Sequence, residues 1–474
     1  MDPIDVPERL GRWSAGRGPL YVLLAARLRQ LIDDEELPPG TALPPDRQFA
    51  ARLAVGRSTV VAAYDLLESE GRIVRRQGSG TRVAGSARPA GPGTTGAPMF
   101  LHLLEPRPEV VSLACAAPDA PPPEIAAAYA AIVPELAALT GEIGYHPAGH
   151  RPLRAALADR YTRLGAPTRP EQILVTNGGQ QALTLLARAL LRPGDRVLLE
   201  TPTYPGALEA FQEQSALLHA LPIGLNGFGA AVRARHPALA YVTPTFHNPT
   251  GATLSVLVRR RLAEEAERAG VPLIVDEVLA DLAFPGETTP PPVAADVDSV
   301  ITISSLSKNL WGGLRVGWIR ADPGLIARLS RLRAVGDLGG NLPAQMAATH
   351  LVANLDALCR AHAPARKAAH DLLLTALAEH LPDWRITPVR GGQSLWIRLP
   401  HGDGSSFAQT ALRHHVAILA GSGLDPSGAS DEYIRIHFRH PPEVLREAVS
   451  RLATAWRAYQ PPVRKQGAVP AFAI

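Results

Sequence analysis

The sequence has 474 residues, 46% of them hydrophobic, with a formal net charge of +4 and an isoelectric point of about 9.2. This length exceeds what one hydrophobic core ordinarily supports, so we expect two or three domains, and the mildly basic balance permits nucleic acid binding without requiring it. The two cysteines, Cys115 and Cys359, lie far apart, which argues against a disulfide scaffold and a zinc site and is typical of the reducing cytosol.

The N-terminus and the apolar runs bear on localisation. The first residues, "MDPIDVPERLGRW", include early acids and no apolar core segment, unlike a signal peptide. No apolar run reaches the roughly 20 residues needed to span a membrane. We therefore expect a cytoplasmic protein with no membrane partner and no bound metal.

The first 83 residues predict a helical segment that ends in a β-hairpin. Apolar residues recur at helical spacing over 19–37, where Pro19 is placed to start a helix. A short helix is expected over 44–55, a tight turn at Gly56, and another helix over 57–71. The stretch "RIVRRQGSGTRVAG" then alternates apolar and basic residues around a Gly-Ser-Gly turn, which is typical of a hairpin. These elements describe a winged helix-turn-helix.

The charges of this segment favour DNA binding. Arg57, Ser58 and Thr59 stand at the start of the second helix of the motif, the end that would enter a major groove. A small helical interaction module with a solvated basic hairpin remains the alternative on the pattern alone. The hairpin carries four arginines that could contact phosphates or enter a minor groove: Arg72, Arg75, Arg76 and Arg82.

The stretch "LPPDRQFAARLAVGRSTVVAAYDLLESEGRIVRRQGSGTRV" resembles the winged-helix head of the GntR regulators. Pro45 departs from that family, which usually has a helix-capping serine there, and Asp46 is expected to take part of the serine's role. The resemblance implies that six residues contact a double-stranded DNA operator: Arg47, Arg57, Ser58, Thr59, Gln77 and Gly78.

A change of composition marks the boundary to the rest of the chain. The stretch "AGSARPAGPGTTGAP" is rich in Gly, Pro and small polar residues and lacks a periodic apolar pattern, so 84–109 is predicted to be a flexible linker. The last residues, 461–474, look irregular. The expected organisation is a DNA-binding domain over 1–83, the linker, a larger domain over 110–460, and the tail.

The larger domain alternates strand and helix patterns. Amphipathic helices lie between several of the strands, as in "VRRRLAEEAERAG". This rhythm predicts an α/β fold with a mostly parallel sheet that is covered by helices on both faces and that binds ligands at the C-terminal ends of its strands. The predicted strands are "QILVT", "RVLLE", "LAYVT", "VPLIVD" and "VITIS".

Two motifs lie at such strand ends. In "VTNGGQQAL", the turn through Gly179 and Gln180 would present free N–H groups at a helix N-terminus, which suits a phosphate but is equally explained as a helix-starting turn. Asp276 ends the very apolar "VPLIVD", where a carboxylate needs a cation or hydrogen bonds. A protonated cofactor nitrogen would serve, and an N-cap role fits equally well.

Lys308 is one of only three lysines in a chain that otherwise uses arginine, the others being Lys367 and Lys465. It follows the apolar strand "VITISS", where a buried ammonium is costly unless it is neutralised or used covalently. Lysine, unlike arginine, can become a neutral amine and form a Schiff base. Arg315 adds a fixed charge nearby that suits a phosphate.

The motifs "SSLSKNLWGGLRVGW", "PTFHNPTG" and "TNGGQQAL" resemble the class I aminotransferases of fold-type I, which bind pyridoxal 5′-phosphate (PLP) and have a small C-terminal α/β subdomain. The resemblance implies that Lys308 forms the Schiff base with PLP and that Arg435 binds the carboxylate of a substrate or effector. It also assigns cofactor contacts to Gly179, Gln180, Tyr204, Asn248, Asp276, Ser305 and Arg315, and to Tyr145, which would reach the partner subunit of a homodimer.

One position departs from the aminotransferase pattern. The family usually has a tyrosine shortly after the aspartate, and "DEVLADL" has Leu279 there, so the cofactor's ring hydroxyl loses a donor. We expect PLP binding to survive, with an altered proton-transfer site.

A GntR-type head on an aminotransferase-like body resembles the MocR subfamily of regulators. By that analogy the protein is a homodimer that senses an amino compound or PLP at Lys308 and alters operator binding. The alternative is a working aminotransferase that carries a DNA-binding head.

Overall fold

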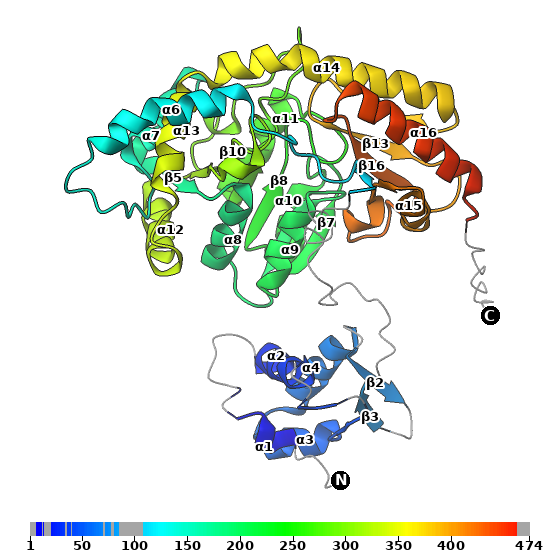
Figure 1. The fold of residues 1–474 in the computed structure, drawn as a ribbon. Helices are drawn as coiled ribbons and strands as arrows, with labels where there is room; N and C mark the ends of the chain where they lie inside the picture. The colour runs from blue at the N-terminus through cyan, green and yellow to red at the C-terminus, as the bar shows by residue number, and fades with distance from the viewer. Residues whose placement is uncertain are drawn as a thin grey trace. The chain divides into compact units, whose positions relative to one another are not determined.

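The structure is a computed structural model that describes residues 6–11, 13, 20–33, 36–38, 40–69, 72–76, 80–84 and 108–461. The chain divides into two compact units, with a boundary after Pro98. Each unit is described by itself below (Figure 1). Most of the predicted linker and the predicted tail lie outside the described residues.

The N-terminal unit is a small helical domain with a three-stranded antiparallel sheet in the order β1-β3-β2. Its core contains Leu28, Phe49 and Tyr64, which are buried. The predicted tight turn is present, but its left-handed residue is Ala54 (φ 53°) rather than Gly56. The elements are α1 (Val6–Arg9), α2 (Leu20–Asp33), β1 (Ala42–Leu43), α3 (Asp46–Leu53), α4 (Arg57–Ser69), β2 (Ile73–Arg76) and β3 (Gly80–Val83).

The large unit is built on a seven-stranded sheet in the order β5-β11-β10-β9-β8-β6-β7. All pairs are parallel except those of β11, which runs antiparallel to β5 and β10. The five predicted strands are present; β7 and β11 were not predicted. The strands are β5 (Ile173–Thr176), β6 (Arg196–Glu200), β7 (Leu217–Leu221), β8 (Leu239–Val242), β9 (Leu273–Asp276), β10 (Ile301–Ser305) and β11 (Gly317–Arg320).

Helices cover both faces of this sheet (Figure 1). Leu273 and Val275 of β9 belong to one hydrophobic cluster and Ile274 to another, because neighbouring side chains of a strand point to opposite faces. The first cluster includes side chains of α6, α7, α11 and α13, and the second those of α8, α9 and α12. The helices are α6 (Pro123–Ala137), α7 (Arg151–Arg163), α8 (Gly179–Leu190), α9 (Pro205–Glu213), α10 (Phe228–Arg235), α11 (Val256–Ala269), α12 (Pro323–Gly336), α13 (Leu342–Ala353) and α14 (Leu355–His380).

A smaller α/β layer with its own core closes the C-terminal part of this unit. Its antiparallel sheet has the order β12-β13-β16-β15, and β14 pairs with β4 from the start of the unit. The first residues after the predicted linker therefore belong to the C-terminal layer. The elements are β4 (Val111–Ser112), β12 (Arg385–Ile386), β13 (Ser394–Arg398), α15 (Gly404–Arg413), β14 (Val416–Ala417), β15 (Leu419–Ala420), β16 (Tyr433–His437) and α16 (Pro442–Ala458).

Short 3₁₀ turns complete the structure at Pro170–Gln172, Val293–Ala295, Gly312–Leu314 and Gly421–Gly423. Within the described residues, no helix combines the length and the apolar character that crossing a membrane requires. Nor does the described part of the chain gather three or more His, Cys, Asp or Glu side chains that could hold a metal ion.

Candidate functional site

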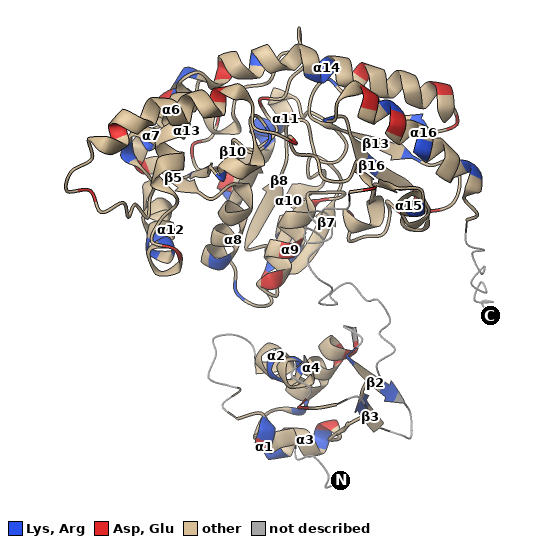
Figure 2. Ribbon diagram, viewed as in Figure 1, with Lys and Arg blue, Asp and Glu red and all other residues tan. Residues whose placement is uncertain are grey.

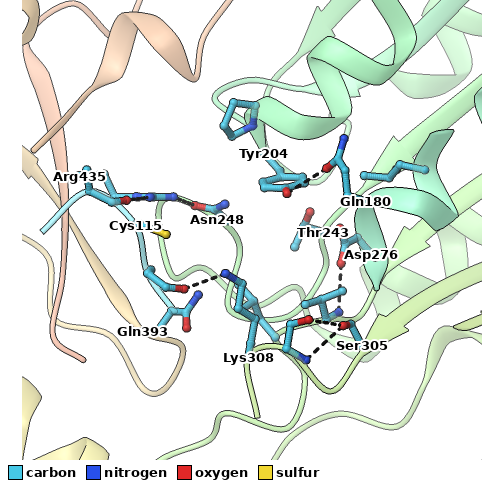
Figure 3. A pocket seen from close by; sticks show the side chains of 18 of the residues that line it. Cys115, Gln180, Tyr204, Thr243, Asn248, Asp276, Ser305, Lys308, Gln393 and Arg435 are labelled. Atoms are coloured by element: carbon cyan, nitrogen blue, oxygen red, sulfur yellow. Dashed lines mark hydrogen bonds between the residues drawn. The ribbon is translucent and has the colours of Figure 1, made fainter. Parts of the chain in front are cut away.

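One pocket lies where the strands of the large sheet end (Figure 3). Asp276 ends β9, Ser305 ends β10 with Lys308 shortly after it, and α8 begins just after β5. Because parallel strands bring their carboxyl ends to one edge of a sheet, these separate motifs meet around one space. Nine predicted cofactor or effector residues line the pocket: Gly179, Gln180, Tyr204, Asn248, Asp276, Ser305, Lys308, Arg315 and Arg435.

Lys308 extends into this pocket, and its Nζ donates to the backbone oxygen of Ala116 at 2.7 Å. Burial lowers the pKa of the Lys308 amine to about 8, and the positive charges of Arg435 and Arg439 act in the same direction. At pH 7 about a tenth of the amine is therefore unprotonated, far more than for a lysine with the ordinary pKa. A neutral amine is the nucleophilic form that attacks an aldehyde.

The Asp276 carboxylate lies opposite, buried with 7% exposure. Its Oδ2 accepts from the Tyr241 hydroxyl at 2.6 Å and its Oδ1 from the Val278 N–H at 3.0 Å. Burial raises the pKa of Asp276, whereas the two hydrogen bonds and the nearby Lys308 oppose this rise. The alternative of a helix N-cap is wrong, because the segment after Asp276 is a turn and not a helix, although the carboxylate accepts from that turn and also lines the pocket.

The turn before α8 brings backbone N–H groups close to a guanidinium. Gly178 has φ +85°, and a Cβ there would lie 2.9 Å from Nη2 of Arg315, so a side chain would displace the arginine. Arg315 donates to the backbone oxygens of Asn177 and Gly312, and its side chain is exposed. A helix N-terminus beside a fixed cation is a suitable seat for a phosphate.

Arg435, on β16, crosses the pocket mouth from the C-terminal layer. Its guanidinium donates to Oδ1 of Asn248 at 2.9 Å and to the backbone oxygen of Ala114, whereas its buried Nε has no hydrogen-bond partner. Because Oδ1 of Asn248 accepts from Arg435, the amide nitrogen of Asn248 remains as a donor toward the pocket. Burial lowers the pKa of Arg435 to about 10, which still leaves it a cation at neutral pH.

Tyr204 is held by a close-packed contact with the start of α8. Its hydroxyl donates to Oε1 of Gln180 at 3.0 Å, and Gln180 donates in turn to the backbone oxygen of Gly206. A Cβ at Gly206 would lie 2.3 Å from Gln180 Oε1, so glycine is needed there. The fixed ring of Tyr204 offers a flat surface on which an aromatic cofactor could stack.

Other predicted residues have different positions. Tyr145 is 61% exposed and does not line this chain's pocket. Leu279 does line it, where the aminotransferase pattern has a tyrosine. Cys115, Thr243 and Gln393 also line the pocket and were not predicted to do so. Gln393 follows two glycines ahead of β13, a weak signal that could have identified it.

The head presents its own candidate site, at the start of α4. Arg47 and Ser58 are exposed, and Arg57 donates from Nε to Oδ2 of Asp46 at 2.8 Å. Thr59 is partly exposed. Asp46 also accepts from the Arg47 N–H at 2.9 Å, although no side-chain cap of α3 is formed at Pro45. Gln77 and Gly78 lie outside the described residues.

The basic hairpin differs in one respect from the prediction. Arg75 of β2 turns back onto α4, where it donates to Asp65 at 2.7 Å and lies over the ring of Tyr64. This arginine therefore fastens the hairpin to the helix. Figure 2 shows the Lys and Arg colour on both β2 and β3.

Comparison with known proteins gives two family matches. Residues 110–452 match aminotransferase class I and II, and residues 20–83 match the bacterial regulatory proteins of the gntR family. The first match covers the larger unit, which contains the pocket, and the second covers the head, which contains α4.

Individual proteins share one or both parts. The chain is 32% identical to the uncharacterized HTH-type transcriptional regulator YdcR of Escherichia coli, over 85% of this chain and 91% of YdcR. It is 29% identical to the probable rhizopine catabolism regulatory protein MocR of Rhizobium meliloti, over 95% of this chain and 96% of MocR. Among solved structures, the α-aminoadipate aminotransferase LysN of Thermus thermophilus, complexed with N-(5′-phosphopyridoxyl)-L-leucine, is similar with a TM-score of 0.69 and 28% identity, over 76% of this chain and 94% of LysN.

The lowered pKa of Lys308 leads to a labelling prediction. In protein stripped of small molecules, the Lys308 amine should react with trinitrobenzenesulfonate at a rate that is half-maximal near pH 8, because the neutral amine predominates above its pKa. Peptide mass spectrometry across pH 6–11 measures this rate, and Lys308→Arg supplies the blank. A midpoint near about 10.4, the ordinary lysine value, would contradict the burial described above.

Proposed function

The chain belongs to the MocR-type regulators, in which a gntR-family head is joined to an aminotransferase class I and II body, and from this we propose that it is a PLP-dependent transcriptional regulator whose pocket controls operator binding. The observation that carries the proposal is the presence, in one chain, of an exposed recognition-helix start and a pocket with a lysine amine at the sheet edge. An enzyme needs only the second of these features.

The cofactor is pyridoxal 5′-phosphate, and the residues present fit it. The neutral Lys308 amine suits the aldehyde, the buried Asp276 carboxylate suits the ring nitrogen, and the free amide nitrogen of Asn248 suits the ring hydroxyl. At the phosphate end, the space that a Cβ at Gly178 would fill is taken by the Arg315 guanidinium. The ring would stack on Tyr204, with Gly179, Gln180 and Ser305 beside the phosphate.

Bound PLP supplies an aldehyde carbon that forms a covalent bond with a primary amine. Lys308 holds the cofactor by its amine, and Arg435 offers its guanidinium to the carboxylate of an incoming amino compound. The unpartnered Nε of Arg435 supports this assignment, since a buried donor without a partner is costly. The proposed effector is thus either an amino compound, preferably one that carries a carboxylate, or PLP itself.

The assembly we propose is a homodimer. Tyr145 is exposed and away from its own pocket, as a residue that completes a partner's phosphate site would be. The proposed organisation is a DNA-binding domain over 1–83, a linker over 84–109, a PLP-binding body over 110–460 and a tail over 461–474. The proposal includes a cytoplasmic location, since the operator DNA lies there.

Ligand binding changes transcription if it favours one of two arrangements of bodies and heads. Coupling requires only that the effector bind one arrangement more tightly, by about 1–3 kcal/mol. Arg435 lies on β16 of the C-terminal layer, and Lys308 follows β10 of the large sheet. A ligand that engages both residues therefore joins the two layers.

The function is tested by the Lys308→Ala variant. Wild-type protein should be coloured and its operator affinity should change by about 5–150-fold when the effector is added. Lys308→Ala should be colourless and its operator affinity should no longer respond, because the amine that bonds the cofactor is gone. Absorbance spectroscopy and fluorescence anisotropy with operator DNA measure the two results. Colourless wild-type protein that PLP cannot reconstitute would refute the proposal.

The recognition helix is tested by Arg57→Ala. Specific operator affinity should fall by at least about 10-fold, the effect of losing one bidentate base contact, while the PLP spectrum stays unchanged. Arg9→Ala is the matched control, since Arg9 is also an exposed head arginine paired with an acid, Glu36. Equal losses in both variants, or none, would show that the start of α4 does not contact the operator.

An aminotransferase is the second candidate, favoured by the near-complete set of pocket residues. With Leu279 in place of a tyrosine, we expect at most one stoichiometric conversion of bound cofactor and no multiple turnovers. Overnight incubation with a panel of amino acids and 2-oxo acids, followed by product quantification, measures this. Product in excess of protein would establish an enzyme, and Leu279→Tyr is the companion variant in which turnover should rise.

A further inference from the structure

Tyr241 lies beneath the pocket, in the middle of the sheet. It is on β8, its side chain is fully buried, and its hydroxyl donates to Oδ2 of Asp276 at 2.6 Å. Tyr241 does not line the pocket, so it would contact a bound cofactor only through Asp276. From the sequence, Tyr241 was expected only to belong to the strand "LAYVT".

The Asp276 carboxylate depends on this contact. Burial disfavours its charge, and the compensating groups are the Tyr241 hydroxyl, the Val278 N–H and the Lys308 amine. Lys308 is the least constant of the three, because its charge depends on pH and on its bond to the cofactor. Glu200 lies near enough to interact unfavourably with an ionised Asp276. Among the residues that the structure describes, the Tyr241 hydroxyl then supplies one of the two hydrogen bonds that favour the ionised carboxylate.

We infer that Tyr241 is a positioning residue, whose hydroxyl holds the Asp276 carboxylate ionised and oriented toward the ring nitrogen of the cofactor. The inference rests on the proposed binding of PLP. Burial raises the pKa of the Tyr241 hydroxyl far above neutrality, so it remains a donor at every pH of interest. With one oxygen fixed by Tyr241 and the other by Val278, the carboxylate plane cannot rotate without breaking a hydrogen bond.

A purely structural role for Tyr241 predicts something different. Its ring packs edge-to-face against Phe211 with centroids 5.8 Å apart, and Tyr241→Phe would preserve that contact. If packing were the only role, removal of the hydroxyl would change stability and nothing else. A positioning role requires a change at the cofactor as well.

The test is Tyr241→Phe in PLP-loaded, full-length protein. Without the hydroxyl, Asp276 is more readily protonated and the cofactor's ring nitrogen loses positive charge. The nitrogen that joins Lys308 to the cofactor then becomes more basic. The pH midpoint of the cofactor's visible absorbance should rise, and the dissociation constant for PLP should increase by about 10-fold, as expected for one charge-assisted hydrogen bond. Spectrophotometric titration measures both.

Tyr161→Phe is the matched control. Tyr161 is also buried in the large unit and its hydroxyl is also hydrogen-bonded, but to Nε1 of Trp318. Tyr161→Phe should lower the melting temperature without moving the pH midpoint of the cofactor's absorbance. Asp276→Ala should alter both the pH midpoint of the cofactor's absorbance and the affinity for PLP. If Asp276→Ala does so and Tyr241→Phe changes neither, the inference is overturned. Failure of wild-type protein to bind PLP would refute the proposed function instead.

A double-mutant cycle covers the case in which Tyr241→Phe folds but is too unstable for the cofactor titration. If the hydroxyl acts through the carboxylate, Tyr241→Phe should cost less stability when combined with Asp276→Ala than it does alone. Equal loss of stability in both backgrounds would overturn the inference, because the hydroxyl would then act independently of Asp276.

Discussion

The pocket depends on one constraint, which is that a carboxylate and an amine must be kept at the end of an apolar sheet. Asp276 and Lys308 follow strands whose other side chains are wholly apolar or small, and neither group has bulk water to solvate it fully. The surrounding hydrogen bonds stabilise both groups. Tyr241 and Val278 donate to the carboxylate, and Ala116 accepts from the amine. A cofactor with a protonated ring nitrogen and an aldehyde carbon would use the carboxylate in its ionised form, which these hydrogen bonds favour, and the amine in its neutral form, which burial favours.

Much of the fold and most of the pocket could be predicted from the sequence, for identifiable reasons. Strands β5, β6, β8, β9 and β10 are short apolar runs that end in turn residues, and their order along the chain implies a parallel sheet. In contrast, β7 has half-buried residues with no alternation, and β11 directly follows a glycine-rich turn, so neither gave a strand pattern. Contacts between distant segments were beyond reach, because no local pattern records that Ala114 meets Arg435 or that Tyr241 meets Asp276.

The head illustrates the same limit at smaller scale. Four hairpin arginines looked equivalent in the sequence, yet Arg75 is bound to Asp65 and Tyr64 of α4. Both partners belong to the helix that directly precedes the hairpin, and the sequence does not show which hairpin arginine turns back onto that helix. The turn before α4 was predicted at the glycine, although the left-handed residue is Ala54. Composition identifies where a turn occurs more securely than which residue adopts the unusual backbone conformation.

The segment just after the linker has a further consequence. Its backbone oxygens at Ala114 and Ala116 accept from Arg435 and Lys308, the two side chains that we assign to the effector and the cofactor. An amine bonded to PLP and a guanidinium bound to a carboxylate each have fewer hydrogens to give to those oxygens. Occupancy of the pocket and the tethering of this segment therefore cannot vary independently. The same segment is the part of the large unit that is nearest in sequence to the head, so a change in these hydrogen bonds would act where the chain enters the large unit.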